Sequence, residues 1–376
     1  MANICDYIKW RGDLSFACDS FNEVDSLVLS QLSYFNFTDL ISADLSNPVY
    51  FRDVVNTFLN LPDYNKRKYI GVFFDSQCDI LLPLAGTSKR FGDLKVCGFR
   101  NVLNTEVEEQ FSALTFIDEK TRSIFIAFRG TDDNLIGWKE DFNLAYQKEL
   151  PAQFDAKNYV AEVAKKFKGN LYICGHSKGG NLAIYSAVEL NPKFQKRICG
   201  IYNNDGPGFT EDFFRRKEYL NIKHVIKTNL PEMSIIGMLF YHDDNYSTVI
   251  SDAPGLVQHN PFTWHIEGNK FLKTSDVKTE SKIISQTILD WYNEMYEDER
   301  MVFVETIFNV INSTDAKTYT DIAKNLPSFV FKFLKATANV EPKTKEKIKK
   351  IFQLLGKNAL ENIEENIREN INKEGK

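Results

Sequence analysis

The segment ICGHSKGGNLA, residues 173–183, places a serine between glycines in the arrangement G-x-S-x-G. An apolar run precedes the serine and an apolar-periodic stretch follows it, so a tight turn between a strand and a helix is expected. Such a turn holds Ser177 in a strained conformation, and residues larger than glycine at 175 and 179 would collide with their neighbours. The pattern predicts a nucleophilic serine for acyl transfer. The alternative is a glycine-rich loop in which the serine is merely small.

A serine nucleophile also needs donors for the oxyanion. In sites of this kind one donor is the backbone N–H of the next residue, here Lys178, and the second comes from a loop after an earlier strand. The segment IAFRGTDDNLIGWKEDF occupies that earlier place, and Thr131 follows its strand directly. We expect Thr131 to offer its N–H and its hydroxyl. A turn or helix-capping threonine is the alternative.

The general base must be one of five histidines. The usual chain order is serine, acid, histidine, with the histidine on a loop after the last strand. His259, in APGLVQHNPFTW, fits this order best, and His242, in FYHDDNY, is second. His176 lies in the serine turn, His224 is expected to open a strand, and His265 is expected in a strand or helix.

Two residues compete for the acid. Asp205, in YNNDGPGF, follows the strand after the serine helix, and its glycines and proline would turn its carboxylate toward the site. An Asx-turn that only shapes the loop is its alternative. Glu232, in NLPEMS, follows a later strand, which is the commoner place for the acid.

The elements around these residues alternate between strand and helix patterns. A hairpin is expected over residues 110–130, followed by an amphipathic helix over 156–169 and a strand at 171–174. Further strands are expected at 197–205, 223–230 and 246–252. This alternation predicts an α/β fold, with a mostly parallel sheet flanked by helices.

From residue 281 onward the pattern is helical, with apolar residues at three- and four-residue spacing. We expect one domain over 1–280 and a helical C-terminal extension over 281–376 that packs on it. The aromatic residues of this extension that we expect to be buried are Trp291, Phe303, Phe308, Phe329 and Phe331.

Composition excludes several classes of protein. The net charge of −5 argues against wide contact with nucleic acid, because phosphate binding needs clustered lysine and arginine. The N-terminus has no apolar signal region, and no stretch is apolar enough to span a membrane, so we expect a cytoplasmic protein without stable membrane insertion. The six cysteines form no CxxC pair, and we expect them reduced.

The pair FRGTDDNLIGWKEDF and GHSKGG resembles the fungal-type class 3 lipases, whose pattern is F-R-G-[ST], W-x-x-D and G-H-S-L-G-G. The resemblance covers about residues 110–265 and implies an α/β-hydrolase fold. Lys178 stands where those lipases carry leucine. A charge beside the nucleophile argues against an apolar triglyceride substrate.

A closer resemblance spans almost the whole chain. The segments DYIKWRGDLSF, FNEVDSLVLSQLSY, GHSKGGNLA, NNDGPGF and QHNPFTW, in this order, are similar to the bacterial Mbeg-like family of lipase-like α/β hydrolases. Because NNDGPGF belongs to this pattern, and the position of Glu232 often carries glutamine in it, the resemblance favours Asp205 as the acid. The N-terminal segments match the same pattern, but their charged residues are expected only to cap helices or form ion pairs.

These observations predict a serine esterase or lipase-like hydrolase with the triad Ser177, Asp205 and His259 and the oxyanion donors Thr131 and Lys178. No metal or organic cofactor is implied, and the expected partner is a small acyl ester or lipid. A catalytically silent binding or scaffold protein with this fold is the alternative of another class. Thioesterase or peptidase chemistry also stays open, because a triad does not determine the leaving group.

Overall fold

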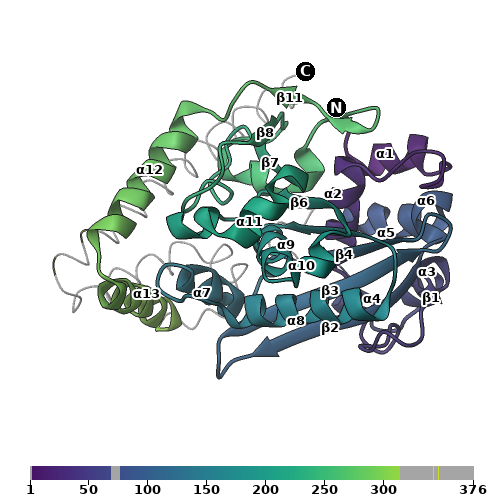
Figure 1. Ribbon diagram of the computed structural model, residues 1–376, viewed down its shortest axis with the longest axis horizontal. Helices are drawn as coiled ribbons and strands as arrows, with labels where there is room; N and C mark the ends of the chain where they lie inside the picture. The colour runs from purple at the N-terminus through teal and green to yellow at the C-terminus, as the bar shows by residue number, and fades with distance from the viewer. Residues whose placement is uncertain (1, 69–76, 314–341, 343–345, 347–376) are drawn as a thin grey trace, which may run out of the picture.

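The centre of the molecule is a mixed sheet in which strands β4 to β8 run parallel. The computed structural model describes residues 2–68, 77–313, 342 and 346. Within these residues the sheet has nine strands in the order β1-β2-β3-β4-β5-β6-β7-β8-β11 (Figure 1). Their bounds are β1 Val49–Tyr50, β2 Lys95–Asn104, β3 Glu109–Asp118, β4 Ser123–Phe128, β5 Asn170–His176, β6 Ile198–Asn204, β7 Ile226–Pro231, β8 Tyr246–Val249 and β11 Lys273–Thr274.

Helices cover both faces of this sheet because its strands present apolar side chains alternately to each side. Along β4, Phe125 and Ala127 face one cluster of buried residues, while Ile124, Ile126 and Phe128 face the other. The helices on the Phe125 side include α1 Ile4–Arg11, α2 Glu23–Leu32, α3 Phe51–Leu59, α5 Cys78–Thr87 and α6 Lys89–Gly92. Those on the opposite side include α8 Pro151–Lys166, α9 Lys178–Val188 and α11 Lys217–Ile222.

The remaining described elements are short turns of helix, a small hairpin and the helices near the end of the described chain. They are α4 Tyr64–Arg67, α7 Leu135–Asn143, α10 Pro192–Gln195, α12 Thr279–Glu294, α13 Glu297–Asn312, the 3-10 helices η1 Glu211–Arg215, η2 Lys223–Val225, η3 Gly255–His259 and η4 Pro261–Thr263, and the hairpin β9 Ile266–Glu267 and β10 Lys270–Phe271.

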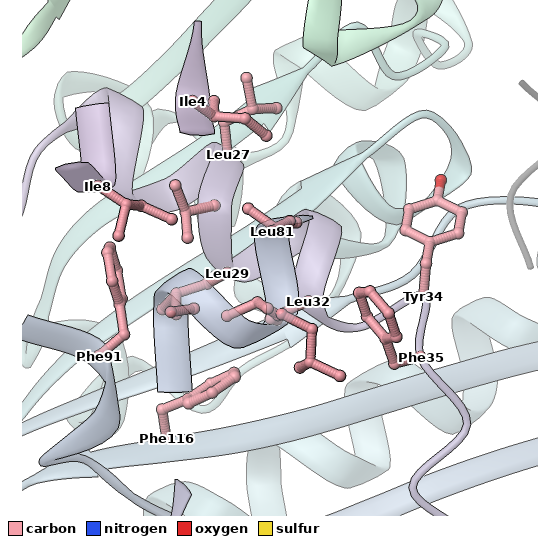
Figure 2. Packing of buried hydrophobic residues seen from close by; sticks show 14 of the residues in the cluster. Ile4, Ile8, Leu27, Leu29, Leu32, Tyr34, Phe35, Leu81, Phe91 and Phe116 are labelled. Carbon is pink, nitrogen blue, oxygen red and sulfur yellow. The ribbon is translucent and has the colours of Figure 1, made fainter. Parts of the chain in front are cut away.

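The N-terminal helices pack tightly on the sheet (Figure 2). The buried Arg90 guanidinium binds both carboxylate oxygens of Asp25 on α2, and it also donates to backbone carbonyls of the preceding loop. Asp25 in addition accepts the N–H of Asn22 in the capping box that begins α2. The capping and pairing roles expected for charged residues of this segment are confirmed for Asp25.

Helices α12 and α13 lie beyond the sheet, and α13 lies next to α7 (Figure 1). Phe303, Phe308 and Ile311 of α13 pack against Leu135 and Phe142 of the α7 region. Trp291, Phe303 and Phe308 are buried as expected, whereas Phe329 and Phe331 lie outside the described residues. The boundary at residue 281 stays a prediction. No helix in the described part of the chain is long and apolar enough to cross a membrane.

The hairpin, the amphipathic helix and the strands predicted after it are confirmed, with corrections to their limits. The helix expected over 156–169 begins at Pro151 and ends at Lys166. His224 lies in the 3-10 turn η2 just before β7 rather than at the start of a strand, and β8 ends at Val249. Strand β2 was not predicted. Its pairing with β3 shifts between Cys97 and Arg100, where Gly98 has φ +68°, and this bulge interrupts the two-residue alternation that identifies a strand.

No disulfide joins any of the six cysteines, all of which lie in the described residues. The parallel central strands with their crossover helices, and the tight turn from β5 into α9, give the chain the α/β-hydrolase fold that the sequence predicted.

Candidate active site

Ser177 lies on the tight turn between β5 and α9, at the carboxyl end of a central strand. Its backbone angles are φ 57° and ψ −134°, which non-glycine residues rarely adopt. The N–H of Ser177 donates to the carbonyl of Asn204 at 3.0 Å, and the N–H of Gly180 donates to the carbonyl of Ser177 at 2.8 Å. The strained turn expected from the sequence is therefore present, and its hydrogen bonds hold the serine in place.

The glycines of this turn allow three backbone segments to meet. A Cβ at Gly175 would lie 2.0 Å from the carbonyl oxygen of Gly179, and a Cβ at Gly179 would lie 2.3 Å from that of Phe128. No side chain fits at these distances, so the collision predicted for larger residues at 175 and 179 is confirmed.

Asp205 and His259 meet at the carboxyl ends of the central strands. Asp205 follows β6 with φ +55° and is fully buried, and one of its oxygens, Oδ2, lies 2.6 Å from Nδ1 of His259. The other oxygen accepts the hydroxyl of Ser234 at 2.5 Å and the N–H of Gly237 at 3.2 Å. Both oxygens of the carboxylate are therefore held, and the carboxylate fixes the orientation of the imidazole ring.

The competing candidates lie elsewhere. Glu232 pairs through its backbone with Val249 and Lys278, and it is not among the described residues that line the cavity containing Ser177. His242 lines a separate, smaller cavity, and its ring lies against Tyr246. His265 precedes β9, outside regular structure, and its Nε2 lies 2.5 Å from Asp252.

The loop after β4 lies directly against Ser177. A Cβ at Gly130 would be 2.7 Å from Cβ of Ser177 and 2.5 Å from the carbonyl of His176, so only glycine allows this approach. The next residue, Thr131, is buried beside the same cavity. Thr131 therefore directly follows a residue that contacts Ser177, and both Thr131 and Ser177 line this cavity.

The hydroxyl of Thr131 is already engaged. It donates to Oδ2 of Asp141 at 2.5 Å, so its single proton is not directed at an oxyanion as the sequence led us to expect. Burial raises the pKa of Asp141 to about 6, and the nearby ammonium of Lys178 opposes this shift. The threonine and aspartate together hold the loop in its position.

Lys178 begins α9, so its N–H has no acceptor within the helix. Its side chain is 1% exposed, and Nζ donates to Oε2 of Glu140 at 2.6 Å and to the carbonyl of Gln110 at 2.9 Å. Glu140 also accepts the N–H groups of Gln110 and Ala152. The charge that stood against an apolar substrate is therefore neutralised by a buried carboxylate.

Ser177, His259, Thr131 and Lys178 line one cavity of about 240 Å³. Its other walls are mostly apolar, and they come from α7, from the loop after β7 and from α12 and α13. The apolar lining residues are Trp138, Phe142, Ala145, Pro207, Ile235, Ile236, Leu239, Phe240, Leu256, Pro261, Ile288, Trp291, Met295, Phe303 and Val304. A serine and a histidine thus line the same mostly apolar cavity.

Several residues around this site were not assigned a role from the sequence. They are Tyr34, Glu140, Asp141, His176, Ser234 and Gly237. Three of them lie in segments that carry the family resemblances: Asp141 is the acid of the W-x-x-D segment, His176 lies in GHSKGG, and Tyr34 ends FNEVDSLVLSQLSY. The contacts that these residues make join segments far apart in the chain, which no local pattern indicates.

Comparison with known proteins gives one family. A model described as Mbeg1-like matches residues 85–309, which is more than half of the chain and includes Ser177, Asp205 and His259. No curated protein sequence matches the chain.

Solved structures similar to the chain include three fungal lipases at low identity. The native Rhizomucor miehei lipase propeptide complex is 14% identical, with a TM-score of 0.37 over 73% of this chain and 80% of that one. Lipase II from Rhizopus niveus is 14% identical, with a TM-score of 0.36 over 73% and 91%. Lip2 lipase from Yarrowia lipolytica is 12% identical, with a TM-score of 0.35 over 70% and 88%.

Proposed function

Because this chain belongs to the Mbeg1-like family and carries a serine, a histidine and an aspartate at the carboxyl ends of its central strands, we propose that it is a serine hydrolase that cleaves carboxylic esters. The bond of 2.6 Å between Asp205 and His259, beside the cavity that Ser177 lines, carries this proposal. Ser234 and Gly237 donate to one oxygen of this buried carboxylate, and the other oxygen faces the imidazole, which is the partner that a base acting on a serine needs.

The first half of the reaction forms an acyl-enzyme. With Nδ1–H donated to Asp205, the lone pair of His259 Nε2 accepts the proton of Ser177 as Oγ attacks the acyl carbonyl. The carbonyl oxygen becomes an oxyanion, and the N–H groups of Lys178 and Thr131 donate to it. The tetrahedral intermediate then expels the alcohol, which takes the proton from His259.

The second half restores the serine. Water gives a proton to His259 and attacks the acyl-enzyme, and the resulting intermediate releases the carboxylic acid while Ser177 recovers its proton. During both halves Asp205 stabilises the imidazolium. This mechanism requires no group beyond the residues named.

The apolar cavity supports an acyl chain as the group that binds beside Ser177. Burial of apolar surface contributes about 25 cal/mol per Å², so an alkyl chain gains more from these walls than a small polar ester does. Trp291 and Phe303 would contact such a chain from α12 and α13. We therefore propose esters with medium or long acyl chains as substrates.

The test combines a covalent probe with an ester panel. A fluorophosphonate should label the wild-type protein and fail to label Ser177→Ala. Ser186→Ala is the matched control. Ser186 is a buried serine of α9 whose hydroxyl donates to the carbonyl of Ala183, and this variant should label normally.

p-Nitrophenyl esters from C2 to C16 then define the chain preference. A higher kcat/KM for C8 or longer than for C2 agrees with the apolar cavity. A wild-type protein that neither labels nor hydrolyses any ester would instead be a binding protein with this fold.

A further inference from the structure

Tyr34 reaches the site from the N-terminal segment, just after the end of α2 and outside residues 85–309. Its side chain lies at the border of the N-terminal cluster, with the hydroxyl directed away from the other labelled residues (Figure 2). That hydroxyl accepts the N–H of Gly130 at 3.1 Å and lies 3.1 Å from Nδ1 of His176. The tyrosine therefore connects the loop before Thr131 with the residue before Ser177.

His176 extends this connection to the base. Its Nε2 lies 2.9 Å from the carbonyl oxygen of His259, and the two imidazole rings lie 4.6 Å apart at an angle of 33°. His176 thus contacts both the backbone and the ring of His259. A single series of bonds runs from the Gly130 loop through Tyr34 and His176 to His259.

The direction of each bond follows from the groups at its ends. A carbonyl can only accept, so Nε2 of His176 carries a hydrogen and donates to His259. Burial, together with the neighbouring His259, lowers the pKa of His176 well below its ordinary value, so the ring is neutral and Nδ1 has only a lone pair. Tyr34 must then donate its hydroxyl hydrogen to Nδ1 while its oxygen accepts from Gly130.

The packing leaves little freedom for these groups. A Cβ at Gly130 would be 2.3 Å from the hydroxyl oxygen of Tyr34 and 2.7 Å from Cβ of Ser177. Tyr34 is 2% exposed and His176 is 4% exposed. A change of a few tenths of an ångström at Tyr34 would therefore reach the loop and the serine turn.

We propose that Tyr34 and His176 are positioning residues that hold the oxyanion loop, the nucleophile and the backbone of His259 in one fixed arrangement. This inference rests on the proposed hydrolase function. It makes the N-terminal segment a part of the active unit rather than an accessory to the fold. Neither residue takes part in bond making, and both act through Gly130, Ser177 and His259.

Tyr34→Phe tests this role, because it removes the hydroxyl and keeps the ring. The variant should displace the oxyanion donor and the nucleophile without removing either. We therefore expect kcat to fall about 10- to 100-fold, which is less than the complete loss of such a group would cause. KM should change by about twofold or less, since the ring that faces the cavity is retained.

Tyr159→Phe is the matched control for stability. Tyr159 is fully buried, donates to the carbonyl of Gly98 at 2.8 Å and lies 2.7 Å from the hydroxyl of Thr115, but it does not line the cavity. Tyr159→Phe should lower the free energy of unfolding by about as much as Tyr34→Phe does, while its kcat stays unchanged. Equal kcat values in the two variants would overturn the inference.

A measurement without turnover separates this inference from the proposed function. ¹⁵N NMR of histidine-labelled protein should find His176 with hydrogen on Nε2 only, and Tyr34→Phe should shift the resonances of both His176 and His259. A hydrogen on Nδ1 of His176, or unchanged His259 resonances in Tyr34→Phe, would overturn the hydrogen-bonded series. Failure of the wild-type protein to hydrolyse any ester would instead overturn the proposed function, while the NMR result would still decide the arrangement.

Discussion

Oδ2 of Asp205 lies 2.6 Å from Nδ1 of His259, and the second oxygen of the same carboxylate is held by Ser234 and Gly237. The imidazole therefore faces a carboxylate that cannot rotate. This relationship favours Asp205 over Glu232 as the acid, because Glu232 pairs through its backbone with Val249 and Lys278 and is not among the described residues that line the cavity containing Ser177.

We predict that Asp205→Asn lowers kcat by up to about 10⁴-fold while the protein stays folded, because an amide favours the wrong tautomer of His259. Glu232→Gln is the control and should retain almost full activity. Steady-state kinetics at pH 7 and circular dichroism check both statements. Full activity in Asp205→Asn would remove Asp205 from the triad.

Thr131→Ala should lower kcat by only about 10-fold, less than the 10²-fold or more typical of a lost oxyanion donor. The reason is that the hydroxyl donates to Asp141 and holds the loop, while the N–H remains. Asp141→Asn should have a similar effect, and the double variant should be no worse than either single one. A much larger loss in Thr131→Ala than in Asp141→Asn would show that the hydroxyl itself contacts the oxyanion.

Lys178→Met should lower the free energy of unfolding by roughly 3–5 kcal/mol, because it leaves Glu140 as a buried charge without its cation. The double variant Lys178→Met/Glu140→Gln should be more stable than Lys178→Met alone. Urea unfolding measures both values. Arg215→Met is the control. It removes the exposed ion pair of Arg215 with Glu211 and should lower the free energy of unfolding by less than about 1 kcal/mol.

Glu109 should make stability depend on pH between its unfolded and folded pKa values. Burial and the adjacent Asp155 raise the pKa of Glu109 from 4.5 to about 7. Between these values the folded protein holds a proton that the unfolded chain lacks, so this contribution to stability is full below pH 4.5 and is lost as the pH rises through 7.

Glu109→Gln carries a neutral side chain at every pH and should therefore become more stable relative to wild type as the pH rises from 4.5 to 8. The gain should be at most about 3 kcal/mol. Thermal unfolding at a series of pH values measures it, with the exposed Glu106→Gln as the control. A constant difference between Glu109→Gln and wild type across this range would contradict the raised pKa.

The elements that the sequence predicted correctly are those with a strong local pattern. Strands β3 to β7 and helices α8 and α9 repeat apolar residues at spacings of two or of three and four, and Ser177 sits in a turn that needs glycine at two defined positions. Asp205 and His259 follow from chain order together with the family resemblance. Local chemistry was sufficient for the elements and for the serine turn, whereas the roles of Asp205 and His259 stay predictions.

The rest of the site depends on contacts that chain order does not specify. Tyr34 is 142 positions before His176, and although it ends a segment that carries the family resemblance, the segment does not indicate which residue its hydroxyl contacts. The hydroxyl of Thr131 was misjudged for the same reason, because its partner Asp141 comes from the far end of a helix. The burial of the Lys178 charge likewise depends on Glu140, which is 38 positions away in the chain and which no sequence pattern pairs with Lys178.

The reactive side chains and the apolar walls of the cavity belong to different parts of the chain. Ser177, Asp205 and His259 follow strands of the sheet, whereas Trp291 and Phe303 belong to helices beyond it. Substitutions on α12 and α13 therefore alter the width and depth of the cavity while the strand ends keep their geometry. Under the proposed function, we therefore expect relatives that differ in α12 and α13 to differ in the acyl chain that they bind while the serine, aspartate and histidine keep their positions.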